Sequence, residues 1–171
     1  MSRRYWLTLV REEENGEDAL WYASRLIESG LYRQAFYDGS VRTPEDFLSL
    51  VRNPNGYVFL SKDIRTGLPA GHVHINNFAG KTCQTHFSIL PSHHGRESVR
   101  MGIEGADQLF ELYRAPSELM LTSLIGITPV ENKLAVRFLT LCGYKLMGEI
   151  DDICEYADGT FHRGLISVRA R

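Results

Sequence analysis

The stretch LIGITPVENKLAVRFLTLCGY, residues 124–144, decides the fold class of this chain. Its apolar beginning belongs to a run from Leu119 to Ile127 that is typical of a buried strand. Asn132 can accept a hydrogen bond from the first turn of a helix, and Gly143 can adopt the left-handed conformation that ends one. The sequence therefore predicts a strand, a turn and a helix over 132–142, with a further strand beginning at Tyr144.

The spacing of apolar residues places the other elements around this stretch. Apolar residues recur at intervals of three and four from Val99 to Tyr113, which predicts a long helix beginning at Glu97. Thr43 followed by Pro44 is typical of a helix start. The other expected elements are a strand over 5–10, a helix opened by residues 16–18 and closed at Gly30, three strands over 56–60, 71–75 and 82–90, and two closing strands over 144–150 and 161–168.

Composition limits the classes of protein to consider. The chain has 171 residues, and its 43% hydrophobic and 23% charged residues are enough for one ordinary core. We therefore expect a single domain over residues 1–171. The formal net charge of -2 lacks the basic excess of proteins that bind a phosphate backbone, so nucleic acid is not an expected partner.

The cysteines and the N-terminus indicate the compartment. Cys83, Cys142 and Cys154 are widely spaced and odd in number, which is typical of free thiols in a reducing environment. His72 and His74 share one strand face but have no third ligand at a readable spacing, so no metal site is expected. The apolar run near the N-terminus is too short for a signal peptide or a membrane span. We expect a cytoplasmic protein with no membrane partner.

The quoted stretch resembles the Asn-x-x-Ala-x-x-Leu-Tyr-x-x-x-Gly-Phe element of the GNAT N-acetyltransferase superfamily, with the spacing from Asn132 to Gly143 intact. The last half of the chain carries this resemblance well, and the first half agrees in the order of its elements. It implies an α/β fold with a central, mostly antiparallel mixed sheet, a splay between strands four and five, and helices on both faces. It also implies transfer of an acetyl group from acetyl-CoA to an amine-bearing acceptor.

The superfamily's second landmark is a loop that holds the coenzyme A pyrophosphate at a helix N-terminus. The stretch FSILPSHHGRESV, residues 87–99, occupies that place, but Glu97 and Val99 stand where small residues are expected. A carboxylate there would repel the pyrophosphate, and a β-branched side chain would hinder its approach. The alternative is a polar loop that only begins a helix. The resemblance assigns to the cofactor Ile89, Leu90, His94, Gly95, Arg96, Glu97, Ser98, Val99 and Asn132.

The same resemblance directs attention to the catalytic groups. Leu139 stands where the superfamily usually carries a tyrosine as general acid, so that role has no candidate. His86, on a central strand, is a candidate general base for an amine. Ser123, on the strand beyond the splay, is the second catalytic candidate. For both side chains the alternative is an ordinary structural role.

The chain also resembles the divergent GNAT-like proteins of tailed phages and prophages, in the run from Gly126 to Ala135 and the Gly-Tyr-x-x-x-Gly ending that starts at Gly143. This implies an alternative function, in which the fold has lost acetyl transfer and serves a binding or structural role in a virion. Glu97 and Leu139 favour the alternative. The expected partners besides an amine acceptor are a second copy of the chain or a phage structural protein.

Overall fold

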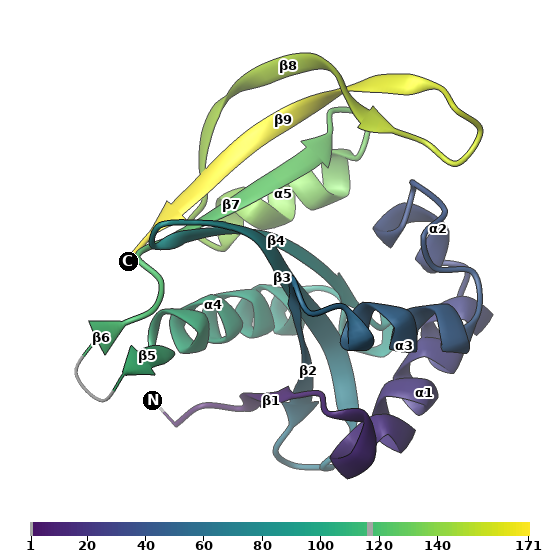
Figure 1. The fold of residues 1–171 in the computed structure, drawn as a ribbon, viewed down its shortest axis with the longest axis vertical. Coiled ribbons are helices and arrows are strands. Elements are labelled where there is room, and N and C mark those ends of the chain that lie inside the picture. The colour runs from purple at the N-terminus through teal and green to yellow at the C-terminus, as the bar shows by residue number, and fades with distance from the viewer. Residues whose placement is uncertain (1, 116–117) are drawn as a thin grey trace.

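A seven-stranded mixed sheet runs through the molecule (Figure 1), which the computed structural model describes over residues 2–115 and 118–171. Its strands lie in the order β1-β2-β3-β4-β7-β9-β8, and β5 and β6 form a separate small hairpin. The elements in chain order are β1 (Tyr5–Leu9), α1 (Glu12–Glu28), α2 (Tyr32–Ala35), α3 (Pro44–Arg52), β2 (Tyr57–Asp63), β3 (Pro69–Ala79), β4 (Thr82–Ile89), a 3-10 turn (Pro91–His93), α4 (Arg96–Phe110), β5 (Tyr113–Ala115), β6 (Glu118–Leu119), β7 (Ser123–Pro129), α5 (Lys133–Leu141), β8 (Lys145–Glu155) and β9 (Phe161–Ala170).

The sheet parts between β4 and β7. These two strands are parallel and pair only where residues 82–84 meet residues 123–125. Every other neighbouring pair in the sheet is antiparallel. Beyond Gln84 and Ile125 the two strands diverge, and Figure 1 shows β7, β9 and β8 leaning away from β1–β4. The expected mixed sheet, with its splay between the fourth and fifth strands, is confirmed.

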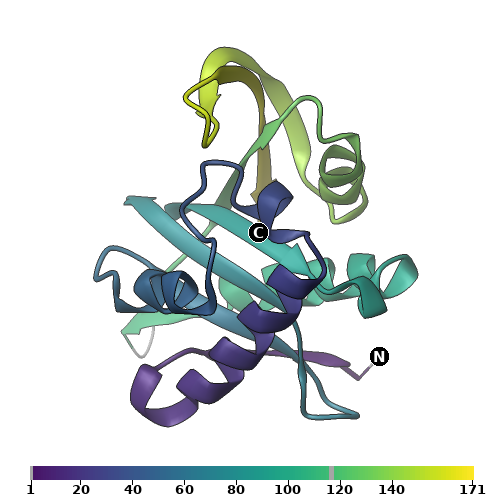
Figure 2. The same ribbon diagram turned by 90° about the vertical axis from the view of Figure 1, so that its right-hand side faces the viewer.

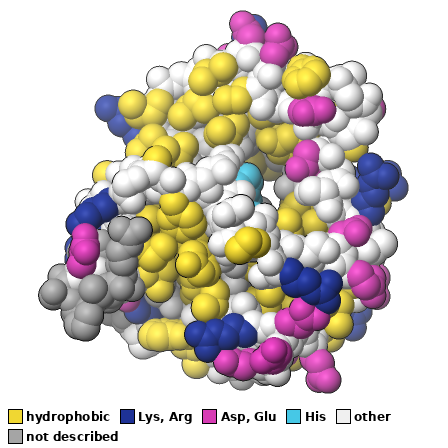
Figure 3. Space-filling view, in the orientation of Figure 1, with side chains coloured by type: hydrophobic (Ala, Val, Ile, Leu, Met, Phe, Trp, Pro, Cys, Tyr) yellow, Lys and Arg dark blue, Asp and Glu magenta, His cyan; other side chains and the backbone are white. Residues whose placement is uncertain are grey.

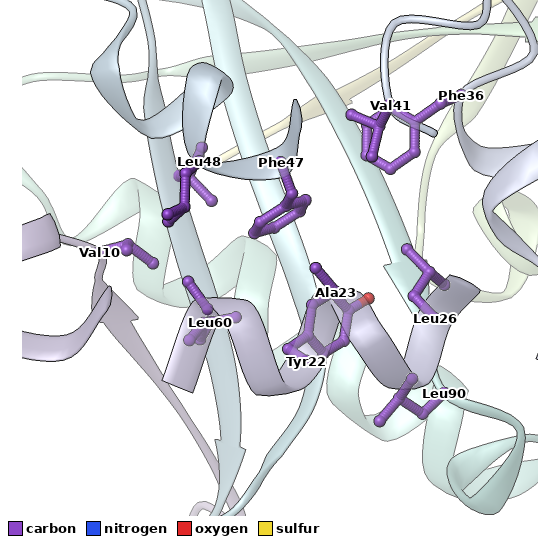
Figure 4. Close-up of a cluster of buried hydrophobic side chains, with 12 residues drawn as sticks. Val10, Tyr22, Ala23, Leu26, Phe36, Val41, Phe47, Leu48, Leu60 and Leu90 are labelled. Carbon is purple, nitrogen blue, oxygen red and sulfur yellow. The ribbon is translucent and has the colours of Figure 1, made fainter. Parts of the chain in front are cut away.

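Helices cover both faces of the sheet. Helices α1, α2 and α3 lie on one face, and α4 and α5 lie on the other (Figures 1 and 2). Tyr22 and Leu26 of α1 pack with Phe47 of α3 against Leu60 of β2 in the first buried cluster (Figure 4). A second cluster fills the space between α4, α5 and the sheet. No helix in the described part of the chain is long and apolar enough to span a membrane.

Local signals placed the helix ends near the site correctly. The Thr43 side chain accepts a hydrogen bond from the Asp46 amide at 3.2 Å, and the Asp46 carboxylate accepts one from the Thr43 amide in return. Gly143 has a φ of 85°, the left-handed conformation expected after α5. The predicted start of α3 and the predicted end of α5 are therefore confirmed.

Two sequence expectations about element boundaries were wrong. The strand expected over 119–127 begins only at Ser123, and Leu119 belongs to the β5–β6 hairpin. The helix expected to reach Tyr113 ends at Phe110, so that Tyr113 starts β5. The apolar pattern of the sequence continues past the end of α4 and begins before the start of β7. The pairing of β5 with β6 in the structure shows where these two elements end and begin.

Candidate active-site cleft

A cleft of about 720 Å³ opens where β4 and β7 part. Its walls include residues 85–89 of β4 and 126–129 of β7, and the N-terminal part of α4 and the length of α5 border it. Figure 3 shows a hollow between the β7–β9–β8 part of the molecule and the α2–α3 region, with a histidine side chain at its base. The splay thus brings two strand edges and two helix beginnings to one place.

Backbone amides of β4 face this cleft at alternate residues. The Leu90 amide, just after the strand, donates to the Ala70 carbonyl at 2.9 Å, so the even-numbered residues of β4 direct their amides towards β3. The amides of Phe87 and Ile89 therefore point towards the gap, where the ladder with β7 has already ended. Leu90 itself differs from its expected cofactor role, because its amide serves the sheet and its side chain packs in the first buried cluster.

The first turn of α4 presents hydrogen-bond donors to the cleft. Gly95, with a φ of 88°, precedes the helix, and no side chain caps the helix start. The Ser98 hydroxyl donates to the Gly95 carbonyl at 2.7 Å and stabilises the turn. His94 Nε2 donates to the Ile89 carbonyl at 3.0 Å, which fixes the turn against β4. The uncapped amides and the Arg96 guanidinium favour an anion at this point.

Glu97 points away from the cleft, although its neighbours line it. Its carboxylate pairs with the Arg4 guanidinium at 2.6 Å and accepts a hydrogen bond from the Tyr5 hydroxyl at 2.9 Å. These partners neutralise the charge beside β1. The repulsion expected between this carboxylate and a pyrophosphate is therefore wrong. Val99, by contrast, lines the cleft as the sequence suggested.

His86 lines the cleft from β4, opposite His74 of β3. Its ring stacks on that of His74 at 5.5 Å, and its Nε2 lies 3.2 Å from Asn76 Oδ1. Burial lowers the pKa of His86, and the charge of Asp38 partly opposes that shift. The imidazole is therefore neutral at pH 7. With Nε2–H donating to the Asn76 amide oxygen, Nδ1 carries the lone pair that can accept a proton.

His72 and His74, which share one face of β3, have structural roles. Burial lowers the pKa of His72 to about 3 and that of His74 to about 4, so both are neutral. His72 Nδ1 lies 2.9 Å from the Ser88 hydroxyl and 3.2 Å from that of Tyr22, inside the first buried cluster. The residues that the structure describes contain no group of three side chains able to hold a metal ion.

The two remaining candidates from the sequence lie in different places. Asn132 precedes α5 and lines the cleft, and its side chain accepts a hydrogen bond from the Ala135 amide at 3.1 Å. Ser123 lies at the paired end of β7, between Thr82 and Ala170. The structure does not bring Ser123 to the cleft or to His86.

Arg137 and Tyr37 are among the cleft-lining residues that sequence reasoning missed. Arg137 lies one helical turn beyond Lys133 on α5, and the helical spacing from Asn132 could have indicated it. Tyr37 follows α2, and its carbonyl accepts a hydrogen bond from the Ala157 amide at 2.9 Å. Burial raises the pKa of Tyr37, so its phenol stays protonated. No local pattern marked Tyr37, since contacts distant in sequence place it.

Solved acetyltransferase structures share this fold. A GNAT-family acetyltransferase from Bacillus anthracis superposes with a TM-score of 0.74 at 16% identity, over 99% of this chain and 96% of that one. The chain has the GNAT fold. A spermidine N-acetyltransferase from Vibrio cholerae in complex with CoA and spermine matches with a TM-score of 0.72 at 15% identity, covering 98% of this chain and 95% of that one. The ribosomal-protein-S5-alanine acetyltransferase from Vibrio fischeri gives 0.71 at 15% identity, with 99% and 94% covered. No protein-family model and no curated protein sequence matches the chain.

Proposed function

We propose that this chain is an acyl-CoA-dependent N-acyltransferase that transfers an acetyl group from acetyl-CoA to an amine. The observation that carries the proposal is the cleft at the splay. There the amides of Phe87 and Ile89, the uncapped start of α4 and a neutral His86 border one space. Fixed donors and a base around one opening suit the attack of an amine on a thioester.

The cleft offers acetyl-CoA a matching set of groups. The pyrophosphate would lie against the amides of residues 95–99, beside the guanidinium of Arg96. Arg137 on α5 adds a second cation to the same cleft. The pantetheine arm would follow the free edge of β4 past Ile89, and Asn132 would lie near the thioester.

The chemistry needs only positioning, one proton acceptor and one backbone donor. The amine nitrogen attacks the thioester carbon, so that a C–N bond forms and the C–S bond breaks, with CoA leaving as its thiol or thiolate. The Phe87 amide is placed to stabilise the negative charge that develops on the carbonyl oxygen. His86 Nδ1 takes the proton that the amine loses.

Acetyl-CoA binding can be tested by thermal denaturation, because a ligand that binds only the folded state raises the melting temperature. Acetyl-CoA at a hundred times its Kd adds about 2.7 kcal/mol of stability. The double variant His94→Ala/Arg96→Ala should lose most of this shift. Arg100→Ala, one turn further along α4 and outside the cleft, is the matched control and should keep it.

A wild-type protein whose melting temperature does not respond to millimolar acetyl-CoA would contradict the proposal. That result would favour the alternative of a GNAT-fold protein with a binding or structural role in a virion, for which the comparisons give no support. We further propose that residues 1–171 form one domain and that the protein is cytoplasmic, in keeping with its three buried free cysteines.

A further inference from the structure

The charges around the cleft are of one sign. Among the described residues that line it, no aspartate or glutamate occurs. The fully charged side chains at its wall are Arg96 and Arg137, which border the face of the sheet covered by α4 and α5. That face suits an anionic co-substrate. It offers nothing that would hold a second ammonium group of an acceptor.

The opposite mouth of the cleft is apolar and uncharged. It lies on the side of α2 and His86, and Leu31, Ala35 and Tyr37 border it together with Ile127 from β7. The polar side chain that the α2 helix adds to this lining is the neutral amide of Gln34. An amine that enters here meets aliphatic and aromatic surface next to a neutral imidazole.

Two carboxylates lie near this mouth without lining it. Glu131, between the lining residues Pro129 and Asn132, lies 3.5 Å from His162 Nδ1. Asp38 follows Tyr37, and its Oδ1 accepts hydrogen bonds from the Ser40 amide at 3.0 Å and the Ser40 hydroxyl at 2.8 Å. These bonds engage one oxygen of the carboxylate, Oδ1, in its own turn. Its charge acts on His86, whose pKa it raises against the effect of burial. Asp38 therefore tunes the base, while the described lining of the acceptor mouth itself contains no carboxylate.

A contact between the segment after α2 and the β8–β9 turn limits the size of this mouth. The Ala157 amide, from the β8–β9 turn, donates to the Tyr37 carbonyl at 2.9 Å. The rings of Tyr37 and Tyr156 lie 5.0 Å apart. Figure 1 shows the β8–β9 turn reaching towards α2 at this point. The segment after α2 and the β8–β9 turn thus bound the acceptor mouth on its outer side.

We propose that the acceptor is a small monoamine with an apolar or aromatic body, and that polyamines are poor acceptors. This inference rests on the proposed acetyltransferase function. Each further ammonium group of a polyamine would lose hydration in this cleft without gaining a carboxylate, which is unfavourable. A phenyl or alkyl body gains by covering Leu31, Ala35 and Ile127.

The test measures release of the CoA thiol with acetyl-CoA and two pairs of amines. The apolar monoamines are 2-phenylethylamine and hexylamine, and the polyamines are putrescine and spermidine. We expect kcat/KM at least tenfold higher for the monoamines, with little dependence on salt because no ion pair holds their bodies. A preference for spermidine, or no transfer to either monoamine by a protein whose melting temperature acetyl-CoA raises, would overturn the inference.

A charge placed at the acceptor mouth gives the matched variant. Gln34→Glu adds a carboxylate of nearly unchanged size to the α2 side of the cleft, and we expect it to raise kcat/KM for putrescine relative to 2-phenylethylamine at least fivefold. Gln34→Met, which removes the amide without adding charge, should not shift the preference towards putrescine. An equal change in both variants would contradict the role of charge. A wild-type protein that does not bind acetyl-CoA would instead refute the proposed function. Failure of the proposed function and failure of the acceptor inference are therefore distinguishable.

Discussion

His86 combines an accessible nitrogen with a lowered pKa. Because burial holds its pKa below 6.5, the base stays neutral, and transfer should be constant with pH down to a limb below pH 6.5. His86→Gln keeps a partner for Asn76 but removes the proton acceptor, so we expect kcat to fall by about 100-fold and the acidic limb to vanish. The pH dependence of kcat measures both effects.

His93→Gln is the control for this prediction, since His93 lies outside the cleft on the 3-10 turn. It should retain both the rate and the limb. Unchanged kcat in His86→Gln would mean that water takes the proton from the amine.

Single residues of the site were predictable where the signal is local. Asn132 caps α5 and Gly143 ends it because both roles depend on the backbone within one turn. The direction of Glu97 was not predictable, since it is set by Arg4 and Tyr5 from the other end of the chain. The sequence pattern indicated that the Glu97 carboxylate would oppose pyrophosphate binding. The ion pair with Arg4, which is distant in sequence, holds this carboxylate away from the cleft.

A glycine of α4, Gly102, packs tightly against α5 and the residue that follows it. A Cβ built on Gly102 would lie 2.4 Å from Cys142 Sγ and 2.6 Å from Phe138 Cζ. Gly102→Ala must therefore push α5 away from α4, and we expect the free energy of unfolding to fall by about 1–3 kcal/mol. Urea denaturation followed by circular dichroism measures the loss.

Gly105 on the same helix is the matched control. A Cβ there meets only Leu7 Cδ2 at 3.8 Å, an ordinary contact. Gly105→Ala should raise the free energy of unfolding by up to about 1 kcal/mol, because alanine favours the helix. Equal losses in the two variants would show that helix packing at Gly102 is looser than described.

The sequence predicted the type of most helices and strands better than it predicted their boundaries. Capping residues and apolar spacing identified α3, α4 and α5, and alternation identified β2–β4. The short α2 and the β5–β6 hairpin were missed, because neither has a periodic pattern long enough to stand out. The failure to predict α2 matters for the site, because α2 and the residues after it supply Gln34 and Tyr37 to the cleft.

At the scale of the molecule, the splay depends on where a ladder stops. The parallel ladder between β4 and β7 covers three residue pairs, and the Thr85 hydroxyl then donates to the Ile125 carbonyl at 3.2 Å. Nothing in the composition of either strand predicts this end point. The resemblance to GNAT proteins supplied the splay as an expectation, and the register of β4 against β7 confirms it.

Two half-sheets joined at a narrow apex need a second support, and the Tyr37 contact with the β8–β9 turn provides it. The Tyr156 ring packs at a tilt against Tyr37, with centroids 5.0 Å apart, and against His162, with centroids 4.1 Å apart. Tyr156→Ala should remove about 0.5–1.5 kcal/mol of local stability and speed hydrogen exchange of the Ala157 amide by roughly tenfold.

The control is Tyr57→Ala, which removes a comparable ring contact with Phe78 at 5.9 Å, away from the cleft. It should leave Ala157 exchange unchanged, and both variants should keep their cooperative unfolding. If exchange at Ala157 stays at the wild-type rate in Tyr156→Ala, the hydrogen bond to the Tyr37 carbonyl holds the two halves together without the rings. The acceptor mouth would then be bounded by backbone alone, and its size would be insensitive to the side chain at position 156.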